Sequence, residues 1–397
     1  MKVALLSREY PPEVYGGAGV HVEYLARELR RLLDHLEVHC FGKPREEEGV
    51  FAHLADPRLV ELDANPALLT LSTDLSMAAA VGGVDLVHSH TWYANFAGHV
   101  AKLLYDIPHV VTTHSLEPLR PWKAEQLGGG YALSSFAEKT TLEAADAVIA
   151  VSAGMARDVL RCYPAIDPAR LHVVHNGIDT EEYRPTPDDG LLQQLGIDPT
   201  LPIVIFVGRI TRQKGLPYLL AAARELRPDA QLVILASAAD TPEIAREVED
   251  AIAALQQARR GVVWIRHMVP KDELIRLLSA ASVFVCPSIY EPMGIVNLEA
   301  MACETAVVAT RTGGIPEVVT DGETGVLVDI DPDPSDPYGA PRDGAAFAHA
   351  LAASINTLLD DPDRAAKLGR AGRQRAVEQF SWTAIAARTA EIYRSLL

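Results

Sequence analysis

The chain has 397 residues, 48% of them hydrophobic and 22% charged, and its formal net charge is −17 (36 Lys and Arg against 53 Asp and Glu). This length exceeds one ordinary hydrophobic core, and with this composition it predicts a globular α/β protein of two domains. The acidic balance argues against general binding to nucleic acid or to an anionic membrane, but it leaves room for a local basic pocket that binds a phosphorylated ligand.

The N-terminus leads directly into a strand-like run, and the sequence contains no apolar stretch long enough to cross a bilayer. Four cysteines, Cys40, Cys162, Cys286 and Cys303, lie far apart and mostly among apolar residues. This pattern favours reduced core thiols. The sequence therefore predicts a cytoplasmic protein with no membrane or nucleic-acid partner, and it gives no oligomeric state.

Short apolar runs alternate with amphipathic stretches along the first half of the chain. The clearest helical spacing covers residues 20–33. Such alternation predicts βαβ units and a parallel sheet that is covered on both faces. The strands expected in this half cover residues 3–7, 37–41, 86–90, 109–114, 147–152 and 171–175.

The same alternation restarts after a polar stretch near residues 176–187, so the domain boundary is expected there. No sequence repeat relates the two halves. The fold expected is α/β, with two Rossmann-like domains. The strands expected in the second half cover residues 203–207, 231–236, 262–266, 283–286 and 306–309.

Polar residues that follow strands are the first place to look for a site, because ligands of open parallel sheets bind beyond the carboxyl ends of the strands. Arg209 and Lys214 follow the expected strand 203–207. Two cations there can neutralise a diphosphate, and arginine can bind it through two parallel bonds. The alternative is ordinary surface charge. The segment is not a P-loop, because it lacks GxxxxGK[ST].

A second candidate is the nonapeptide from Glu291 to Glu299, which follows the expected strand 283–286. Gly294, Ile295 and Val296 open a predicted helix, whose first amides can bind an anion. Glu299, about one turn further on, can accept two bonds from a ribose diol, and Glu291 can hold hydroxyls of a transferred sugar. The alternative is a capped helix with solvated glutamates. Together with the two cations, the nonapeptide favours a nucleotide-sugar site.

Two further clusters follow strands of the first half. Gly16 and Gly17 precede the first helix and let a ligand approach its amides, although the loop is not GxGxxG and can equally be a turn that needs positive φ. His114 ends its expected strand, where it can meet a ligand hydroxyl or phosphate, whereas His88 and His90 favour structural roles. A metal site is the alternative for these histidines, but no Cys or carboxylate has ligand spacing nearby, so none is predicted.

At this point the chain resembles the retaining GT-B glycosyltransferases over essentially its whole length. The Glu-x7-Glu pattern, the Gly-Arg…Lys-Gly loop and the glycine loop occur there. The resemblance is closest to the actinobacterial glycogen synthase group, which includes α-maltose-1-phosphate synthase. The stretches that carry this closer match are residues 8–19, 88–93, 115–123 with 126–131, and 206–215.

The resemblance implies domains of residues 1–177 and 178–379 facing each other across a cleft, with a last helix, 380–397, packing back on the first. Catalytic roles are implied for His114, Arg209, Lys214 and Glu291. Donor contacts are implied for Gly16, Gly17, Arg209, Lys214, Gly294, Ile295, Val296 and Glu299.

The activity implied is retaining transfer of glucose from ADP-glucose to α-glucose 1-phosphate, to glycogen, or to both, without a metal or another cofactor. Arg120 and Lys123 supply cations for an acceptor phosphate. Typical bacterial glycogen synthases carry Lys-x-Gly-Gly where this chain has Val14, Tyr15 and the two glycines, and they are longer. Both departures move the chain away from an enzyme that only elongates glucan, and they leave the acceptor open between α-glucose 1-phosphate and glycogen. The alternatives are another donor or acceptor, a nucleotide-sugar epimerase, a sugar-binding protein without activity, and a nicotinamide dehydrogenase, which the missing GxGxxG disfavours.

Overall fold

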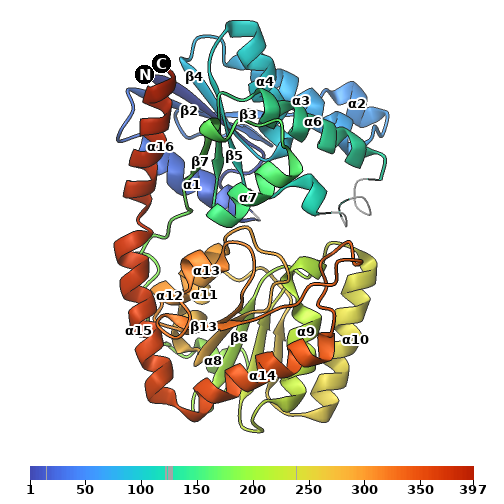
Figure 1. Ribbon diagram of the computed structural model, residues 1–397, viewed down its shortest axis with the longest axis vertical. Coiled ribbons are helices and arrows are strands. Elements are labelled where there is room, and N and C mark those ends of the chain that lie inside the picture. Colours follow the sequence, from blue (N-terminus) through green and yellow to red (C-terminus); the bar gives the residue numbers. More distant parts are fainter. Residues whose placement is uncertain (15, 121–122, 124–127, 238) are drawn as a thin grey trace. The chain divides into compact units, whose positions relative to one another are not determined.

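The structure is a computed structural model that describes residues 1–14, 16–120, 123, 128–237 and 239–397. These residues form two compact units (Figure 1): Met1–Gly177 with Trp382–Leu397, and Ile178–Ser381. The first unit ends at Gly177, and the chain returns to it at Trp382. Within the second unit, the backbone amide of Ile178 donates to the carbonyl of Phe380 at 2.8 Å.

The described part of the first unit contains a seven-stranded parallel sheet in the order β3-β2-β1-β4-β5-β6-β7. The parallel sheet predicted from the alternating pattern is therefore confirmed. The edge strand β3 was not expected, and His114 lies just beyond β5 rather than in it. The strands are β1 (Lys2–Ser7), β2 (His35–Phe41), β3 (Val50–His53), β4 (Leu86–His90), β5 (His109–Thr113), β6 (Ala147–Ala150) and β7 (Leu171–Val173).

Helices cover both faces of this sheet. Alternate residues of β1 point to opposite faces: Leu5 joins the core under α1 and α16, and Leu6 joins the core under α3 and α4. The terminal helix α16 contributes Trp382 and Tyr393 to the first core. The helices are α1 (Gly17–Leu29), α2 (Pro57–Glu61), α3 (Pro66–Ala80), α4 (Trp92–Tyr105), α6 (Gly130–Ala144), α7 (Ala153–Cys162) and α16 (Trp382–Leu396), with short 3₁₀ turns η1 (Glu117–Leu119) and η2 (Pro168–Arg170).

The described part of the second unit contains a six-stranded parallel sheet in the order β10-β9-β8-β11-β12-β13. Its central strands are buried along their whole length, which is why they appear in the sequence as continuous apolar runs. Strand β13 was not expected. The strands are β8 (Ile203–Val207), β9 (Gln231–Leu235), β10 (Val262–Ile265), β11 (Val283–Cys286), β12 (Ala306–Thr310) and β13 (Gly325–Val328).

Helices pack on this second sheet through a core that includes Phe206, Leu219 and Leu351. None of the helices described in either unit is long and apolar enough to span a bilayer. The helices of this unit are α8 (Leu191–Gln194), α9 (Leu216–Ala222), α10 (Pro242–Ala258), α11 (Lys271–Ala280), α12 (Ile295–Ala302), α13 (Ile315–Val318), α14 (Gly344–Asp360) and α15 (Pro362–Gln379), with 3₁₀ turns η3 (Arg212–Lys214) and η4 (Ala223–Glu225).

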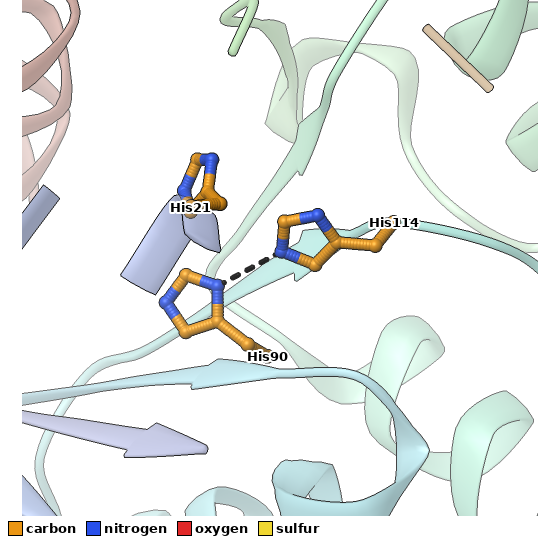
Figure 2. A group of neighbouring side chains, drawn as sticks. All are labelled: His21, His90 and His114. Atoms are coloured by element: carbon orange, nitrogen blue, oxygen red, sulfur yellow. Dashed lines mark hydrogen bonds between the residues drawn. The ribbon is translucent and has the colours of Figure 1, made fainter. Parts of the chain in front are cut away.

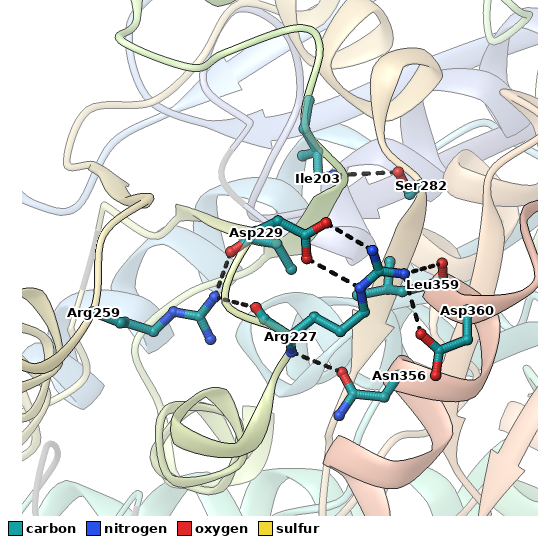
Figure 3. A network of polar contacts seen from close by, with 9 residues as sticks. Ile203, Arg227, Asp229, Arg259, Ser282, Asn356, Leu359 and Asp360 are labelled. Carbon is teal, nitrogen blue, oxygen red and sulfur yellow. Dashed lines mark hydrogen bonds and ion pairs between the residues drawn. The ribbon is translucent and has the colours of Figure 1, made fainter.

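An arginine network fastens the end of α14 to the loop before β9 (Figure 3). The guanidinium of Arg227 donates to both carboxylate oxygens of Asp229 and, at 2.8 Å, to the carbonyl of Leu359. Arg259 donates to the carbonyl of Arg227 at 2.9 Å. The ion pair is partly exposed and contributes little by itself. The bonds to backbone carbonyls hold the loop, because each one satisfies an acceptor that has no strand partner.

Candidate functional site

The carboxyl ends of β8 and β11 are where the topology of the second unit predicts a crevice. These strands are neighbours, and from them the strand order runs in opposite directions along the sheet. At such a switch point the two following loops diverge and leave a space in which ligands bind. The loops are residues 208–215 after β8 and 287–294 after β11, and each contains residues that the sequence analysis selected.

Backbone contacts fix these two loops against each other. The amide of Ile289 donates to the carbonyl of Gln213 at 2.9 Å. Gly215 has a φ of +65°, and a Cβ there would lie 1.9 Å from the carbonyl oxygen of Pro287. Only glycine combines that conformation with so close an approach. The side chains on the two loops are therefore held by the backbone and not by their own packing alone.

The two loops bring Lys214 and Glu291 into contact. Lys214 Nζ lies 2.6 Å from Glu291 Oε2, and the hydroxyl of Ser288 donates to the same oxygen at 3.1 Å. Both of these bonds end on Oε2 of Glu291. Among the described residues, its other carboxylate oxygen, Oε1, accepts neither of them and is available to a ligand hydroxyl. Burial lowers the pKa of Lys214, but the Glu291 carboxylate outweighs it, so the pKa lies above its ordinary value. Lys214 is therefore a fixed cation at the crevice.

Arg209 lies at the same end of β8 and takes a different partner. Its Nη1 is 2.8 Å from Oδ1 of Asp240, a half-buried residue in the loop after β9. The amide of Asp240 donates to the carbonyl of Ile210 at 3.0 Å, which ties the loop after β9 to the loop after β8. Asp240 therefore orients the guanidinium without occupying its whole set of donors.

Helix α12 begins at Ile295, directly after Gly294, and its first amides face the same end of the sheet as Lys214. The Oε1 atom of Glu299, in the middle of this helix, accepts a bond of 3.3 Å from the hydroxyl of Tyr183. Burial raises the pKa of Glu299 to about 7. Its carboxyl group therefore changes charge near neutral pH, which an exposed glutamate does not do.

The glycine loop of the first unit is bound by an acidic side chain. The amide of Gly16 donates to Oε2 of Glu9 at 2.8 Å, and Glu9 follows β1 directly. The expectation of an open amide at Gly16 is therefore wrong in this conformation, because a carboxylate already occupies the start of α1. Gly17 is exposed at the first position of that helix. Val14 stands where glycogen synthases carry lysine, and Tyr15, the next residue, lies outside the described residues.

His114 lies among other histidines beyond the ends of β4 and β5. Its Nε2 is 3.1 Å from Nδ1 of His90, and His21 of α1 lies close to both (Figure 2). Burial lowers the pKa of His21 to about 4 and lowers those of His90 and His114, so all three are neutral near pH 7. His88 is instead enclosed in the core, where it bonds to Tyr393 and Thr112.

The expected acceptor segment is only partly described, since residues 121–122 and 124–127 lie outside the described residues. Arg120 Nη1 donates to Ser115 Oγ at 2.9 Å, and Lys123 is buried. Two buried glutamates connect this segment to α6: the backbone amide of Glu117 donates to Oε1 of Glu138 at 2.8 Å. Burial, and then the charge of Glu117, raise the pKa of Glu138 to about 8.

A cavity of about 440 Å³ opens beyond the carboxyl ends of β1 to β4 in the first unit. Its lining includes Arg8, whose guanidinium carbon lies 4.1 Å from the centre of the Tyr93 ring, together with Trp92 and Thr70. Aromatic faces beside a cation suit a small phosphorylated sugar, because the rings pack on sugar C–H groups and the cation binds the phosphate.

Comparisons with known proteins agree with this geometry. Residues 15–182 match the Glycosyltransferase Family 4 model, and residues 189–336 match the Glycosyl transferases group 1 model. The chain is 58% identical to an α-maltose-1-phosphate synthase of Mycolicibacterium smegmatis and 56% identical to one of Mycobacterium tuberculosis, with all of each chain covered. It belongs to the α-maltose-1-phosphate synthase family of GT-B glycosyltransferases. It is therefore a hexosyltransferase.

A solved structure supports the same fold. The sucrose-phosphate synthase from Thermosynechococcus elongatus matches 100% of this chain and 99% of its own, with a TM-score of 0.78 and 26% identity. The two Rossmann-like sheets expected from the alternating pattern are thus confirmed as those of a GT-B glycosyltransferase.

Sequence reasoning missed three residues that lie beside the candidates in one unit or the other. Asp240 positions Arg209, Arg8 lines the cavity, and His21 completes the histidine group. Arg8 follows a strand, and Asp240 lies a few residues beyond one, so the rule that found the other candidates also pointed to them. His21 gave no such signal, because it lies within a helix and only the fold brings it to the strand ends.

Proposed function

We propose that this α-maltose-1-phosphate synthase homologue transfers glucose from ADP-glucose to the 4-hydroxyl of α-glucose 1-phosphate. The bond between the anomeric carbon and the donor phosphate oxygen breaks, and an α-1,4 bond to the acceptor oxygen forms. The acceptor proton goes to the leaving phosphate on the same face, so the products are maltose 1-phosphate and ADP with configuration retained. Glycogen is the second acceptor we propose.

The observation that carries this proposal is the position of Arg209, Lys214 and the first amides of α12 at one switch point. Negative charge grows on the leaving diphosphate as the glycosidic bond breaks. Cations and amides already fixed in place stabilise that charge without reorganising. We assign the two cations and the amides of Gly294, Ile295 and Val296 to the diphosphate, Glu299 to the ribose and Glu291 to the glucosyl ring. No metal is needed in this scheme.

The first unit supplies the proposed acceptor side. The cavity with Arg8 and Tyr93 fits a phosphorylated monosaccharide in size and chemistry. Arg120 and Lys123 remain proposed acceptor residues, although Arg120 bonds to Ser115 and Lys123 is buried, so each has to change its contacts to meet a phosphate. His114 is proposed to contact the transferred sugar, with Gly16 and Gly17 near the donor phosphates once Glu9 yields the Gly16 amide.

One assay matrix tests the substrates. ADP-glucose and UDP-glucose are each combined with α-glucose 1-phosphate and with glycogen, and release of the nucleoside diphosphate is measured. We expect the highest kcat/KM for ADP-glucose with α-glucose 1-phosphate. Activity with glycogen alone contradicts the phosphorylated acceptor, and release that needs no acceptor indicates an epimerase or a hydrolase. Proton NMR of the product identifies the α anomer that retention requires.

The pH dependence of donor binding tests Glu299. The ionised side chain of Glu299 can accept hydrogen bonds from both ribose hydroxyls, whereas the protonated side chain cannot accept both equally well. Burial raises its pKa to about 7, above the ordinary value. Lowering the pH from 8 to 6 converts most molecules to the neutral form. The KM for the donor is therefore expected to rise about tenfold over this interval, in proportion to the lost ionised fraction. Initial rates across the interval measure this change.

The control for this prediction is Glu299→Gln, which keeps the shape of the side chain but cannot titrate. Its donor KM is expected to be high at pH 8 and nearly constant down to pH 6. A pH profile as steep in Glu299→Gln as in the native enzyme assigns the titration to another group and removes Glu299 from donor binding.

A further inference from the structure

Three histidines from separate elements converge in the first unit. His21 comes from α1, His90 ends β4 and His114 follows β5 (Figure 2). One ring nitrogen from each lies within 4.8 Å of the other two. His90 is fully buried and His21 is 2% exposed, while His114 is half-buried, so the group can be reached from solvent past His114.

The hydrogen bond to Asn176 fixes the tautomer of His21 and leaves a lone pair on its other ring nitrogen. His21 Nδ1 lies 2.6 Å from the side-chain oxygen of Asn176, which can only accept, so Nδ1 carries the proton and Nε2 carries the lone pair. Among the described residues this buried Nε2 has no hydrogen-bond partner. A second group that fixes the tautomer of an imidazole in this way is typical of metal-ligating histidines.

The distance between His90 and His114 also fits a shared ion. Their facing nitrogens, Nδ1 and Nε2, are 3.1 Å apart. Two imidazole nitrogens bound tetrahedrally to one Zn²⁺ lie about 3.3 Å apart, given bonds of about 2.0–2.1 Å. A movement of about 1.5 Å by the His21 ring brings its nitrogen from the 4.8 Å limit to the same spacing.

We propose that His21, His90 and His114 form a Zn²⁺ site that holds the enzyme inactive while the ion is bound. Three imidazoles leave a fourth position for water, as in open three-histidine sites. Imidazole nitrogens select zinc and its transition-metal neighbours, whereas Mg²⁺ requires oxygen ligands. Coordination occupies His114 Nε2. Since His114 is the proposed contact to the transferred sugar, bound zinc blocks transfer, and this consequence alone rests on the proposed function.

Zinc binding is tested on the full chain without using the transfer reaction. Titration calorimetry with ZnCl₂ is expected to show one site, and MgCl₂ is expected to show none. Co²⁺ in place of zinc is expected to give the intense visible spectrum of a tetrahedral nitrogen-ligated ion, without the thiolate band of a cysteine site. His21→Gln is expected to lower the affinity for zinc at least about a hundredfold. Loss of a residue that only hydrogen-bonds to a metal ligand already costs 10–100-fold in affinity.

Two matched variants control for other ligands. His267→Gln removes an exposed histidine of the second unit, and Cys162→Ser removes a half-buried thiol; both are expected to bind zinc like the native chain. Absence of a zinc site, an octahedral cobalt spectrum, or equal affinity in His21→Gln each overturns the proposal. The cobalt spectrum decides this on the unaltered chain even where His21→Gln does not fold.

The transfer assay then separates the two proposals. Zinc is expected to inhibit the native enzyme, and EDTA is expected to restore it. Relative to its own rate without zinc, His21→Gln is expected to need a far higher zinc concentration for half-inhibition than the native enzyme. If zinc binds without inhibiting transfer, the zinc site is supported, but the proposed role of His114 in transfer is contradicted.

Discussion

Replacement of Lys214 by alanine is expected to lower kcat for glucosyl transfer about a thousandfold, the upper range for loss of one preorganised charge-stabilising group. The ammonium that we propose to face the leaving diphosphate is lost. In addition, Glu291, whose side chain is only 7% exposed, loses the cation 2.6 Å away. A buried carboxylate without its partner is strongly disfavoured, so it takes up a proton or turns away from the sugar. Steady-state kinetics at saturating donor and acceptor measure the effect.

The matched control is Lys367→Ala, which removes an exposed lysine of α15 and is expected to keep the native rate. The double variant Lys214→Ala with Glu291→Gln is expected to be little slower than Lys214→Ala alone, because the two residues act as one unit. A kcat within tenfold of native for Lys214→Ala, with unchanged thermal unfolding, contradicts the assigned role.

The elements that the sequence predicted well are those with a strong local signal. Continuous apolar runs such as β8 and β11 were placed residue for residue, because a strand that is buried on both faces must be apolar throughout. The strands β3 and β13 were missed. Each lies at a sheet edge and is buried over only part of its length, so it lacks the continuous buried run that marks a central strand such as β11.

In the candidate site, too, the residues with a local sequence signal were predicted and the contacts that depend on the fold were not. The rule that ligands bind at strand ends led directly to Arg209, Lys214 and Glu291, and the structure brings the last two together. The strand-end rule also points to Asp240, but which residue each acidic side chain contacts was not predictable. Asp240 meets Arg209 across 31 residues of sequence, and Glu9 meets the amide of Gly16 through a bend in the loop after β1. Such contacts depend on how loops from different strands fold over one edge, and residue spacing carries no information about that.

Replacement of Gly313 by alanine is expected to disrupt the site almost as strongly, although Gly313 bears no functional group. Its φ is +54°, and a Cβ would lie 1.9 Å from the carbonyl oxygen of Glu291. The same oxygen accepts a 2.9 Å bond from the amide of Gly314. The methyl group therefore displaces the backbone of Glu291 or breaks this bond. We expect a loss of about 3–5 kcal/mol of stability, the range in which strain and a lost buried bond add up, and at least a hundredfold lower kcat.

Gly322→Ala separates the two causes of this loss. Gly322 also has a left-handed φ, +75°, but nothing lies within 4 Å of a Cβ built there. Gly322→Ala is therefore expected to lose only the stability that a left-handed backbone conformation costs alanine, about 1–2 kcal/mol. Its kcat is expected to equal that of the native enzyme. Thermal unfolding and kcat are measured for both variants at a temperature where both are folded. Equal effects at the two positions mean that conformational strain alone explains Gly313, and the contact with Glu291 then has no part in holding its proposed catalytic carboxylate.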